Sequence, residues 1–184
     1  MQVIETDLPG VVLVEPAVFE DGRGYFLETY HSHRYAENGL PSAFVQQNLS
    51  FSKRGVLRGL HYQLGRPQGK LVMVARGEIF DVAVDIRKNS PTYGRWTGAT
   101  LSTANCRQIY IPEGFAHGFC VTGESATIVY MCTDFYAPAE ERGIRWDDPM
   151  LKIPWPVEEP ILNGKDAAYP FLADAPPCDL PEFG

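Results

Sequence analysis

The feature that most constrains the fold is a series of short β-prone segments, each ended by a turn. Between residues 11 and 136, stretches rich in valine, isoleucine and aromatic residues alternate with glycine, proline and asparagine. Residues 79–86 alternate strictly, so that Phe80 and Val82 share one face while Asp81 takes the other. Many short strands with glycine and proline turns predict an all-β fold, arranged as a sandwich or a barrel.

The same pattern predicts individual elements. One short helix is expected over residues 31–39. Residues 70–86 predict a hairpin whose turn lies at residues 76–78. Two separate strands are expected over residues 119–121 and 126–136, with a glycine-containing turn between them.

The length and charge limit the class of protein. A chain of 184 residues is one domain or one domain with a tail, and residues 1–184 are expected to form a single domain. Beyond residue 137, prolines and acidic residues predict a C-terminal tail that wraps around the barrel with one short helical turn. The net charge of -7 argues against a nucleic-acid surface, although local arginines could hold a small phosphorylated ligand.

No segment of the sequence indicates secretion or insertion into a membrane. The longest apolar runs, such as residues 11–14, are far too short to span a bilayer. Residues 1–7 lack the basic start and the apolar stretch of a signal peptide. The cysteines form no CxxC pair and have no zinc-ligand spacing. We therefore expect a cytoplasmic protein with reduced thiols and no membrane partner.

His61 and Lys70 are the first candidates for chemistry. His61 lies in a β-prone run, and Lys70 opens the next one. If the two strands are neighbours, a proton-transferring imidazole and a cation that holds negative charge can face one cavity. Arg58 has the opposite strand parity, so it can share the site only if a bulge near Gly59 breaks the alternation. A hydrogen-bonded structural histidine is the alternative.

A second histidine, His117, follows a proline–glycine turn. This spacing resembles the second signature of cupins, which are small jelly-roll barrels that often bind a metal. The first cupin signature has two histidines separated by one residue, whereas here those positions hold His61 and Gln63, and Lys70 lies near the expected glutamate. Two histidines are too few for a stable metal site, so a metal-free cupin is expected.

Two further candidates depend on their surroundings. Tyr130 and Tyr136 share strand parity, so both could face a barrel interior as proton donors or stacking groups. They could equally be core or rim aromatics. Asp166 could orient a histidine from a distant part of the chain, although the pair formed by Lys165 and Asp166 is also typical of a solvated surface.

An ordered set of motifs extends over nearly the whole chain. They occupy residues 19–26, 46–48, 55–63, 68–72, 81–87, 90–94, 111–119, 133–136 and 165–166. Each motif alone is modest, but the set in this order is highly specific. It resembles the dTDP-4-dehydrorhamnose 3,5-epimerases, which are cupin-type sugar-nucleotide epimerases.

The resemblance implies a role for each candidate residue. His61 would be the general base, with Asp166 as its orienting carboxylate. Tyr130 would be the general acid, and Lys70 would face the C4 oxygen of the sugar. The residues implied to line the nucleotide-sugar pocket, with Tyr136 stacked on the sugar or nucleotide, are Arg23, Phe26, Glu28, Gln46, Gln47, Asn48, Arg58, His117, Tyr136, Glu141 and Lys165.

The implied reaction suits these residue types. A ketone at C4 acidifies the hydrogens at C3 and C5, and a neutral histidine with a pKa of about 6.5 can remove one. Lys70 can hold the enolate, and a tyrosine with a pKa of about 10 can return a proton from the opposite face. The resemblance thus predicts metal-independent epimerisation of dTDP-4-dehydro-6-deoxy-D-glucose to dTDP-4-dehydro-L-rhamnose, without a cofactor. It also implies a homodimer in which exchanged N-terminal strands bring Arg23 to the neighbouring site.

Three alternatives remain open at this point. A relative that inverts only one centre would use nearly the same residues. A catalytically silent cupin would bind sugar nucleotides without turning them over, and a metal-dependent cupin oxygenase or isomerase would need a bound metal. The nucleotide base and the downstream sugar pathway are equally open.

Overall fold

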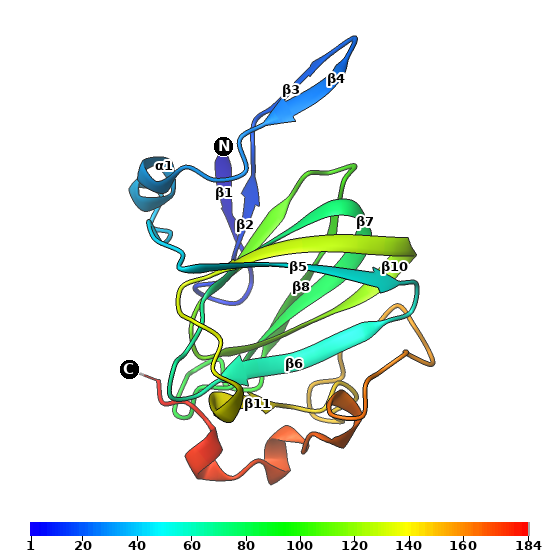
Figure 1. Cartoon of the computed structure of the whole chain (residues 1–184). Helices are drawn as coiled ribbons and strands as arrows, with labels where there is room; N and C mark the ends of the chain where they lie inside the picture. The colour runs from blue at the N-terminus through cyan, green and yellow to red at the C-terminus, as the bar shows by residue number, and fades with distance from the viewer. Residues whose placement is uncertain (184) are drawn as a thin grey trace.

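The computed structural model describes residues 1–183. Its elements follow the predicted series of short strands, with one α-helix near the N-terminus and several 3-10 turns (Figure 1). The strands are β1 (Gln2–Glu5), β2 (Val12–Glu15), β3 (Val18–Asp21), β4 (Gly24–Leu27), β5 (Gln46–Lys53), β6 (Leu57–Gln63), β7 (Lys70–Asp85), β8 (Trp96–Ser102), β9 (Gln108–Ile111), β10 (Phe115–Cys132) and β11 (Glu141–Gly143).

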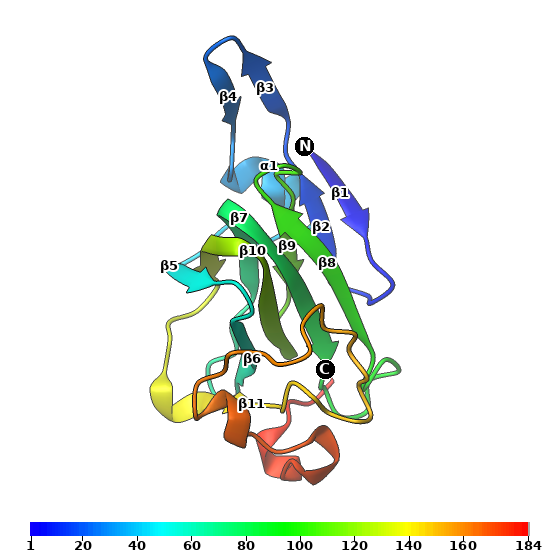
Figure 2. The ribbon, with the colours of Figure 1, turned by 90° about the vertical axis from the view of Figure 1, so that its right-hand side faces the viewer.

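Among residues 1–183, nine of these strands form one antiparallel sheet. Its order is β1-β2-β9-β7-β10-β6-β11, with β5 also paired to β10 and β8 to β7. The sheet curves into a barrel, as Figures 1 and 2 show from two directions, and buried apolar side chains form its core. The prediction of an all-β barrel is confirmed.

The two longest strands were predicted wrongly as broken segments. Residues 70–86 do not form a hairpin, because β7 runs unbroken through Gly77 and pairs with β10 on both sides of it. In the same way, β10 is one strand where two were expected. Gly77 has a φ of +85°, and a Cβ there would lie 1.9 Å from the carbonyl oxygen of Ser125. The glycines therefore mark a shared bend with a change of register, which in sequence looks the same as a turn.

The helix prediction is confirmed. Helix α1 spans Ser32–Glu37 within the expected residues 31–39, and His31 caps its first turn by accepting a hydrogen bond from the Arg34 amide. Gly39, with a φ of +76°, follows its end. None of the described helices is long and apolar enough to cross a membrane.

The C-terminal tail wraps around one end of the barrel, as predicted. It contributes Leu172, Ala175 and Leu180 to a buried cluster with Val82 and Val84 of β7. The tail holds more helical turns than the single one expected. They are 3-10 turns at Asp166–Ala168 (η2), Leu172–Asp174 (η3) and Pro177–Asp179 (η4), after an earlier one at Pro138–Glu140 (η1). Through η2 this tail brings a carboxylate back to the barrel.

Strands β3 and β4 form a hairpin that projects away from the barrel (Figures 1 and 2). Its aromatic side chains are largely exposed, with 64% of Phe19, 54% of Tyr25 and 68% of Phe26 accessible. Its pairing is confined to its own two strands, and an isolated two-stranded hairpin is marginally stable in water.

Candidate active site

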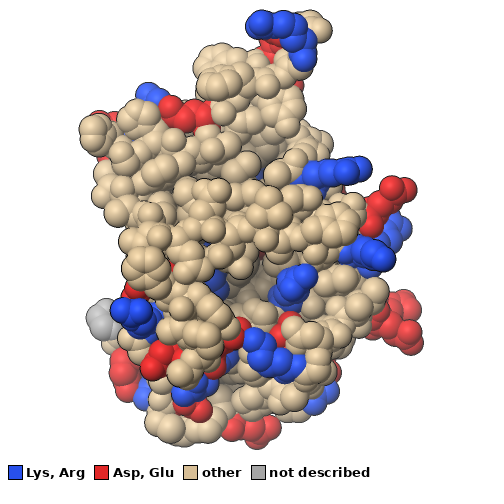
Figure 3. Space-filling model, viewed as in Figure 1, with Lys and Arg blue, Asp and Glu red and all other residues tan. Residues whose placement is uncertain are grey.

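A cavity of about 320 Å³ opens between β5, β6, β7, β10 and β11. Figure 3 shows a hollow on this face of the molecule with basic side chains around it. The residues that line the cavity are Gln46, Asn48, Ser50, Arg58, His61, Tyr62, Gln63, Gln68, Lys70, Val72, His117, Phe119, Ile128, Tyr130, Tyr136, Glu141, Asn163 and Lys165. Most of the predicted site residues therefore meet in one place.

His61 and Asp166 form an imidazole–carboxylate pair. Nε2 of His61 lies 2.8 Å from Oδ1 of Asp166, while Oδ2 accepts a hydrogen bond from the Gly59 amide at 3.1 Å. The Asp166 side chain is fully buried, whereas 26% of the His61 side chain is exposed. Burial opposes ionisation of Asp166, but the hydrogen bond and charge of His61, with the Gly59 amide and Lys165, hold its pKa below the usual range.

A β-bulge brings Arg58 and His61 to the same cavity. His61 pairs with His117 on β10 and Arg58 pairs with Phe119, so three steps along β6 match two steps along β10. At Gly59, with a φ of +123°, a Cβ would lie 2.5 Å from the Gly118 Cα. The predicted break in parity is confirmed, and only glycine fits the crossing point.

His117 forms a second imidazole–carboxylate pair on the neighbouring strand. Its Nε2 lies 3.0 and 2.9 Å from the two carboxylate oxygens of Asp81. The Asp81 side chain is fully buried, and 10% of the His117 side chain is exposed. Sequence reasoning missed this partner, although an aspartate inside an otherwise apolar strand was a usable signal because a buried carboxylate needs a hydrogen-bond donor.

Lys70 and Tyr130 face the cavity from β7 and β10. Within residues 1–183, the Lys70 ammonium has no hydrogen-bond or ion-pair partner. Desolvation lowers the pKa of Lys70, against the opposing influence of Cys132, Asp81 and Glu141. Burial raises the pKa of Tyr130, so this phenol keeps its proton at neutral pH.

Tyr136, Glu141 and Lys165 form a hydrogen-bonded cluster that lines the cavity. The Tyr136 hydroxyl donates to Oε2 of Glu141 at 2.6 Å, and Nζ of Lys165 donates to the same oxygen at 2.8 Å. The bond to Glu141 raises the pKa of Tyr136 to about 12. Burial opposes ionisation of Glu141, but the bonds from Lys165 and Tyr136 outweigh it and lower its pKa.

The three predicted amide side chains of strand β5 lie on opposite faces of the strand. Gln46 and Asn48 line the cavity and are joined by a hydrogen bond of 3.0 Å between their side chains. Gln47 lies between them on an alternating strand, is exposed and is not among the lining residues. Leu49 and Phe51, which have the same parity as Gln47, are 68% and 55% exposed.

The structure does not bring the three predicted residues of the N-terminal hairpin region to this chain's own cavity. Arg23 pairs with Asp21 at 2.6 Å on the hairpin itself. Glu28 pairs with Arg34 of α1, and the largely exposed Phe26 packs against Phe19. Their roles as binding residues stay predictions.

The cavity also contains residues that sequence reasoning did not assign to it. Gln63 shares strand parity with His61, which was the signal that could have identified it. Gln68 and Asn163 come from loops, where no periodicity indicates the direction of a side chain. Asn163 also accepts a hydrogen bond from the Asp166 amide at 2.7 Å, which fixes the start of η2.

Two histidines with carboxylate partners do not make up a metal-ligand set. Among residues 1–183, no group of three or more histidine, cysteine, aspartate or glutamate side chains is placed to hold a metal ion. Nε2 of each histidine is already hydrogen-bonded to an aspartate. A reaction without metal or cofactor stays a prediction.

The sequence of this chain is similar to those of known proteins. The sequence model of the dTDP-4-dehydrorhamnose 3,5-epimerase family matches residues 5–174. A dTDP-4-dehydrorhamnose 3,5-epimerase from Neisseria gonorrhoeae is 55% identical over 95% of this chain, which spans only 54% of that relative's length. The enzyme of the same name from Methanothermobacter thermautotrophicus is 53% identical, with 94% of this chain and 95% of the relative covered.

A solved structure gives the same result. The dTDP-6-deoxy-D-glucose-3,5-epimerase from Legionella pneumophila Philadelphia 1, in complex with dTDP-4-keto-L-rhamnose, is 48% identical and has a TM-score of 0.97. The match covers 100% of this chain and 98% of that one. The predicted cupin-type jelly-roll barrel is confirmed by this likeness and by the sheet topology. The chain belongs to the dTDP-4-dehydrorhamnose 3,5-epimerase family.

Proposed function

We propose that this protein epimerises dTDP-4-dehydro-6-deoxy-D-glucose at C3 and C5 to dTDP-4-dehydro-L-rhamnose. The observation that carries the proposal is that His61, Lys70 and Tyr130 line one cavity, with Asp166 hydrogen-bonded to His61. These side chains supply a base, its orienting carboxylate, a cation and an acid, which is the set that inversion next to a ketone requires.

His61 is the proposed base. An ionised Asp166 accepts a hydrogen bond from Nε2–H of His61, so the neutral imidazole carries its lone pair on Nδ1. Nδ1 removes the hydrogen from C3 or C5, and the buried carboxylate stabilises the imidazolium that forms. Lowering of the Asp166 pKa supports this role, because the carboxylate then stays charged throughout the working pH range.

Lys70 is the proposed partner of the developing enolate oxygen. Its lack of a partner among the described residues supports the assignment, because the ammonium is available to a ligand. An anionic sugar nucleotide would favour the charged form of Lys70 and offset the desolvation that lowers its pKa. One such donor is typically worth roughly 3 to 4 kcal/mol of transition-state stabilisation.

Tyr130 is the proposed acid that returns a proton to the opposite face of the carbanion. It lies on β10 opposite Val72 and Asn48, whereas His61 lies on β6, so the two groups approach the cavity from different strands. A raised pKa keeps its proton in place until the carbanion forms.

The remaining cavity residues suit the nucleotide part of the substrate. Arg58 carries a forked guanidinium that can grip a diphosphate, and its Nε is held by the Ser52 hydroxyl at 3.1 Å. Gln46 and Asn48 offer amide groups. Tyr136 offers an aromatic face with 49% of its surface exposed, and Glu141, Lys165 and His117 complete the proposed pocket.

The proposed assembly is a homodimer with exchanged hairpins. The exposed Phe19 and Phe26 on the hairpin, and Leu49 and Phe51 on β5, support an apolar contact with a second copy. In that dimer Arg23, Phe26, Glu28 and the outward-facing Gln47 would serve the site shared with the partner. Since the four cysteines are unpaired, as is usual in a reducing compartment, we also propose a cytoplasmic location.

The function is tested with the protein and dTDP-4-dehydro-6-deoxy-D-glucose in deuterated water. Deuterium at both C3 and C5, with formation of the L-rhamno product, is the expected result. Deuterium at one carbon only would establish a single-centre epimerase instead. Exchange at neither carbon, with the nucleotide sugar still bound, would refute catalysis and favour a silent binding protein.

The shared site is tested by mixing two inactive variants. If Arg23 serves the neighbouring site, Arg23→Ala and His61→Ala subunits that re-form dimers recover one intact site in each mixed dimer, roughly a quarter of parental activity. No recovery in a mixture shown by mass spectrometry to contain mixed dimers would contradict the exchange.

A further inference from the structure

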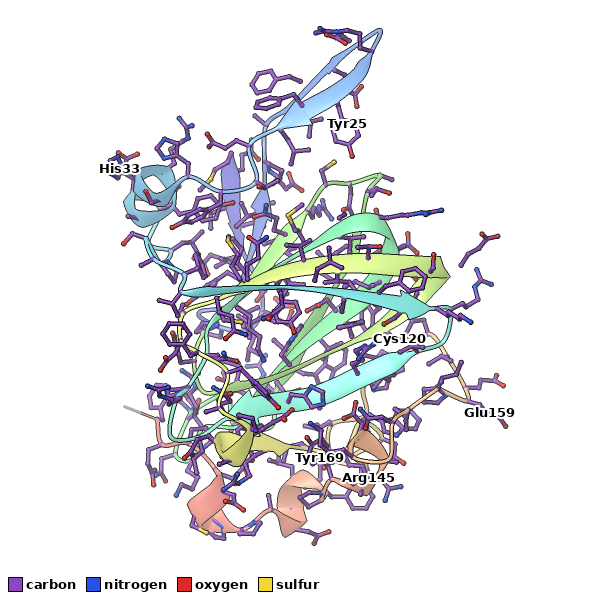
Figure 4. The ribbon with its side chains drawn as sticks, in the orientation of Figure 1. Tyr25, His33, Cys120, Arg145, Glu159 and Tyr169 are labelled. Atoms are coloured by element: carbon purple, nitrogen blue, oxygen red, sulfur yellow. The ribbon has the colours of Figure 1, made fainter. Side chains whose placement is uncertain are left out.

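An aromatic residue of the C-terminal tail packs against the His61 ring. Tyr169, which follows η2, has its ring centroid 5.8 Å from that of His61, with an interplanar angle of 70°. This is an edge-to-face contact within the range that aromatic pairs prefer. Tyr169 is not among the cavity-lining residues, and it lies by β6 and β11 at the edge of the barrel (Figure 4).

The backbone of β11 is shaped to admit the Tyr169 ring. Gly143 is the cross-strand partner of His61, and a Cβ at Gly143 would lie 2.4 to 2.5 Å from three atoms of the tyrosine ring. Any other residue there would clash with the tyrosine ring in its present position. The carbonyl of the next residue, Pro170, accepts a hydrogen bond from the Arg145 amide at 2.9 Å, which fixes the chain beside the ring.

The hydroxyl of Tyr169 does not account for the residue's position. This oxygen is buried and has no hydrogen-bond partner among the described residues. A buried hydroxyl without a partner is destabilising, so what this side chain contributes at this place comes from its ring. The same short segment carries Asp166, whose carboxylate holds the other restraint on His61.

We propose that the Tyr169 ring is a positioning group for the His61 base. Asp166 fixes one nitrogen of the imidazole, and the contact with the Tyr169 ring limits the swing of the imidazole about that hydrogen bond. The two contacts together hold Nδ1 toward the cavity. This inference rests on the proposed epimerase function, because it explains what orients His61, the base of that reaction.

The test compares Tyr169→Leu and Tyr169→Phe with a matched control, Phe171→Leu. Phe171 lies on the same tail, but its ring covers Arg145 rather than His61. Tyr169→Leu is expected to lower kcat roughly tenfold to a hundredfold, because small misplacements of reacting groups carry costs of that order. KM should stay within roughly twofold, since the ring does not line the binding cavity. Tyr169→Phe keeps the ring and should retain parental kcat.

Three results would overturn the inference. The first is parental kcat in a folded Tyr169→Leu protein. The second is a loss in Tyr169→Phe as large as that in Tyr169→Leu, which would assign the role to the hydroxyl. The third is an equal loss in Phe171→Leu, which would reduce the effect to general stability. A parent protein without epimerase activity would instead refute the proposed function, so the two failures are distinguishable.

Discussion

Replacing Asp166 by asparagine would remove the buried negative charge next to His61 with little change in side-chain size. Two contacts are affected, the 2.8 Å contact with Nε2 of His61 and the 3.1 Å bond from the Gly59 amide. A hydrogen bond to a charged group is worth about 1.5 to 3 kcal/mol, which corresponds to roughly a tenfold to two-hundredfold change in rate. The neutral amide also no longer selects the imidazole tautomer with its lone pair on Nδ1, and this loss adds to the effect.

The expected result for Asp166→Asn is therefore a fall in kcat of at least roughly tenfold, with a ceiling near 10⁴-fold from the analogous change in Ser-His-Asp triads. KM should change little, because Asp166 does not line the cavity. The assay is single-turnover wash-in of deuterium at C3 and C5 of the substrate. Asp174→Asn is a matched control, since Asp174 lies on the same tail but is exposed.

The same variant has a stability signature that depends on pH. The pKa of Asp166 is lower in the folded protein than its ordinary value of 3.8, so its ionised form stabilises the fold above that value. This contribution is lost as the pH falls through the folded-state pKa. The stability gap between parent and Asp166→Asn should therefore close in acid. A folded variant with kcat within roughly twofold of the parent would refute the proposed role of the pair.

Three further predictions follow from the same structure. Lys70→Met should lower kcat roughly 10²- to 10³-fold through loss of the cation at the enolate oxygen, and deuterium incorporation at C3 and C5 should fall together. Incorporation at the parental rate would exclude Lys70 as the group that stabilises the enolate. Tyr130→Phe should still exchange deuterium through His61 but form much less inverted product, so a parallel loss of exchange and inversion would contradict its role as the acid. Burial opposes ionisation of Asp85, but hydrogen bonds from Arg87, Ser90 and Thr92 lower its pKa to about 2. Asp85→Asn should therefore be about 2 kcal/mol less stable than the parent at pH 7, and this difference should disappear between roughly pH 4 and pH 2 in urea titrations. A difference in stability that stays constant over that range would contradict stabilisation by the ionised carboxylate.

The sequence alone determined the all-β class, the approximate positions of most strands and the identity of most cavity residues. Alternation is a local property, so it indicated the strand containing Phe80 without knowledge of the partner strand. The extent of α1 was also a local signal, because the predicted residues 31–39 contain both the capping His31 and the terminating Gly39. The ordered motifs contain His61 and Lys70, whereas Tyr130 was indicated by the strand parity that it shares with Tyr136.

Only the tertiary structure decided how these residues face one another. Gly77 bends a continuous strand instead of ending it, and the choice depends on the Ser125 carbonyl in a different strand. The bulge opposite Gly118 overrides the parity that separates Arg58 from His61. Asp166 reaches His61 across a sequence separation of 105 residues, which no local period can encode. Side-chain periodicity reports the neighbours along one strand, whereas the active site is made by contacts between segments that meet only after the barrel has closed.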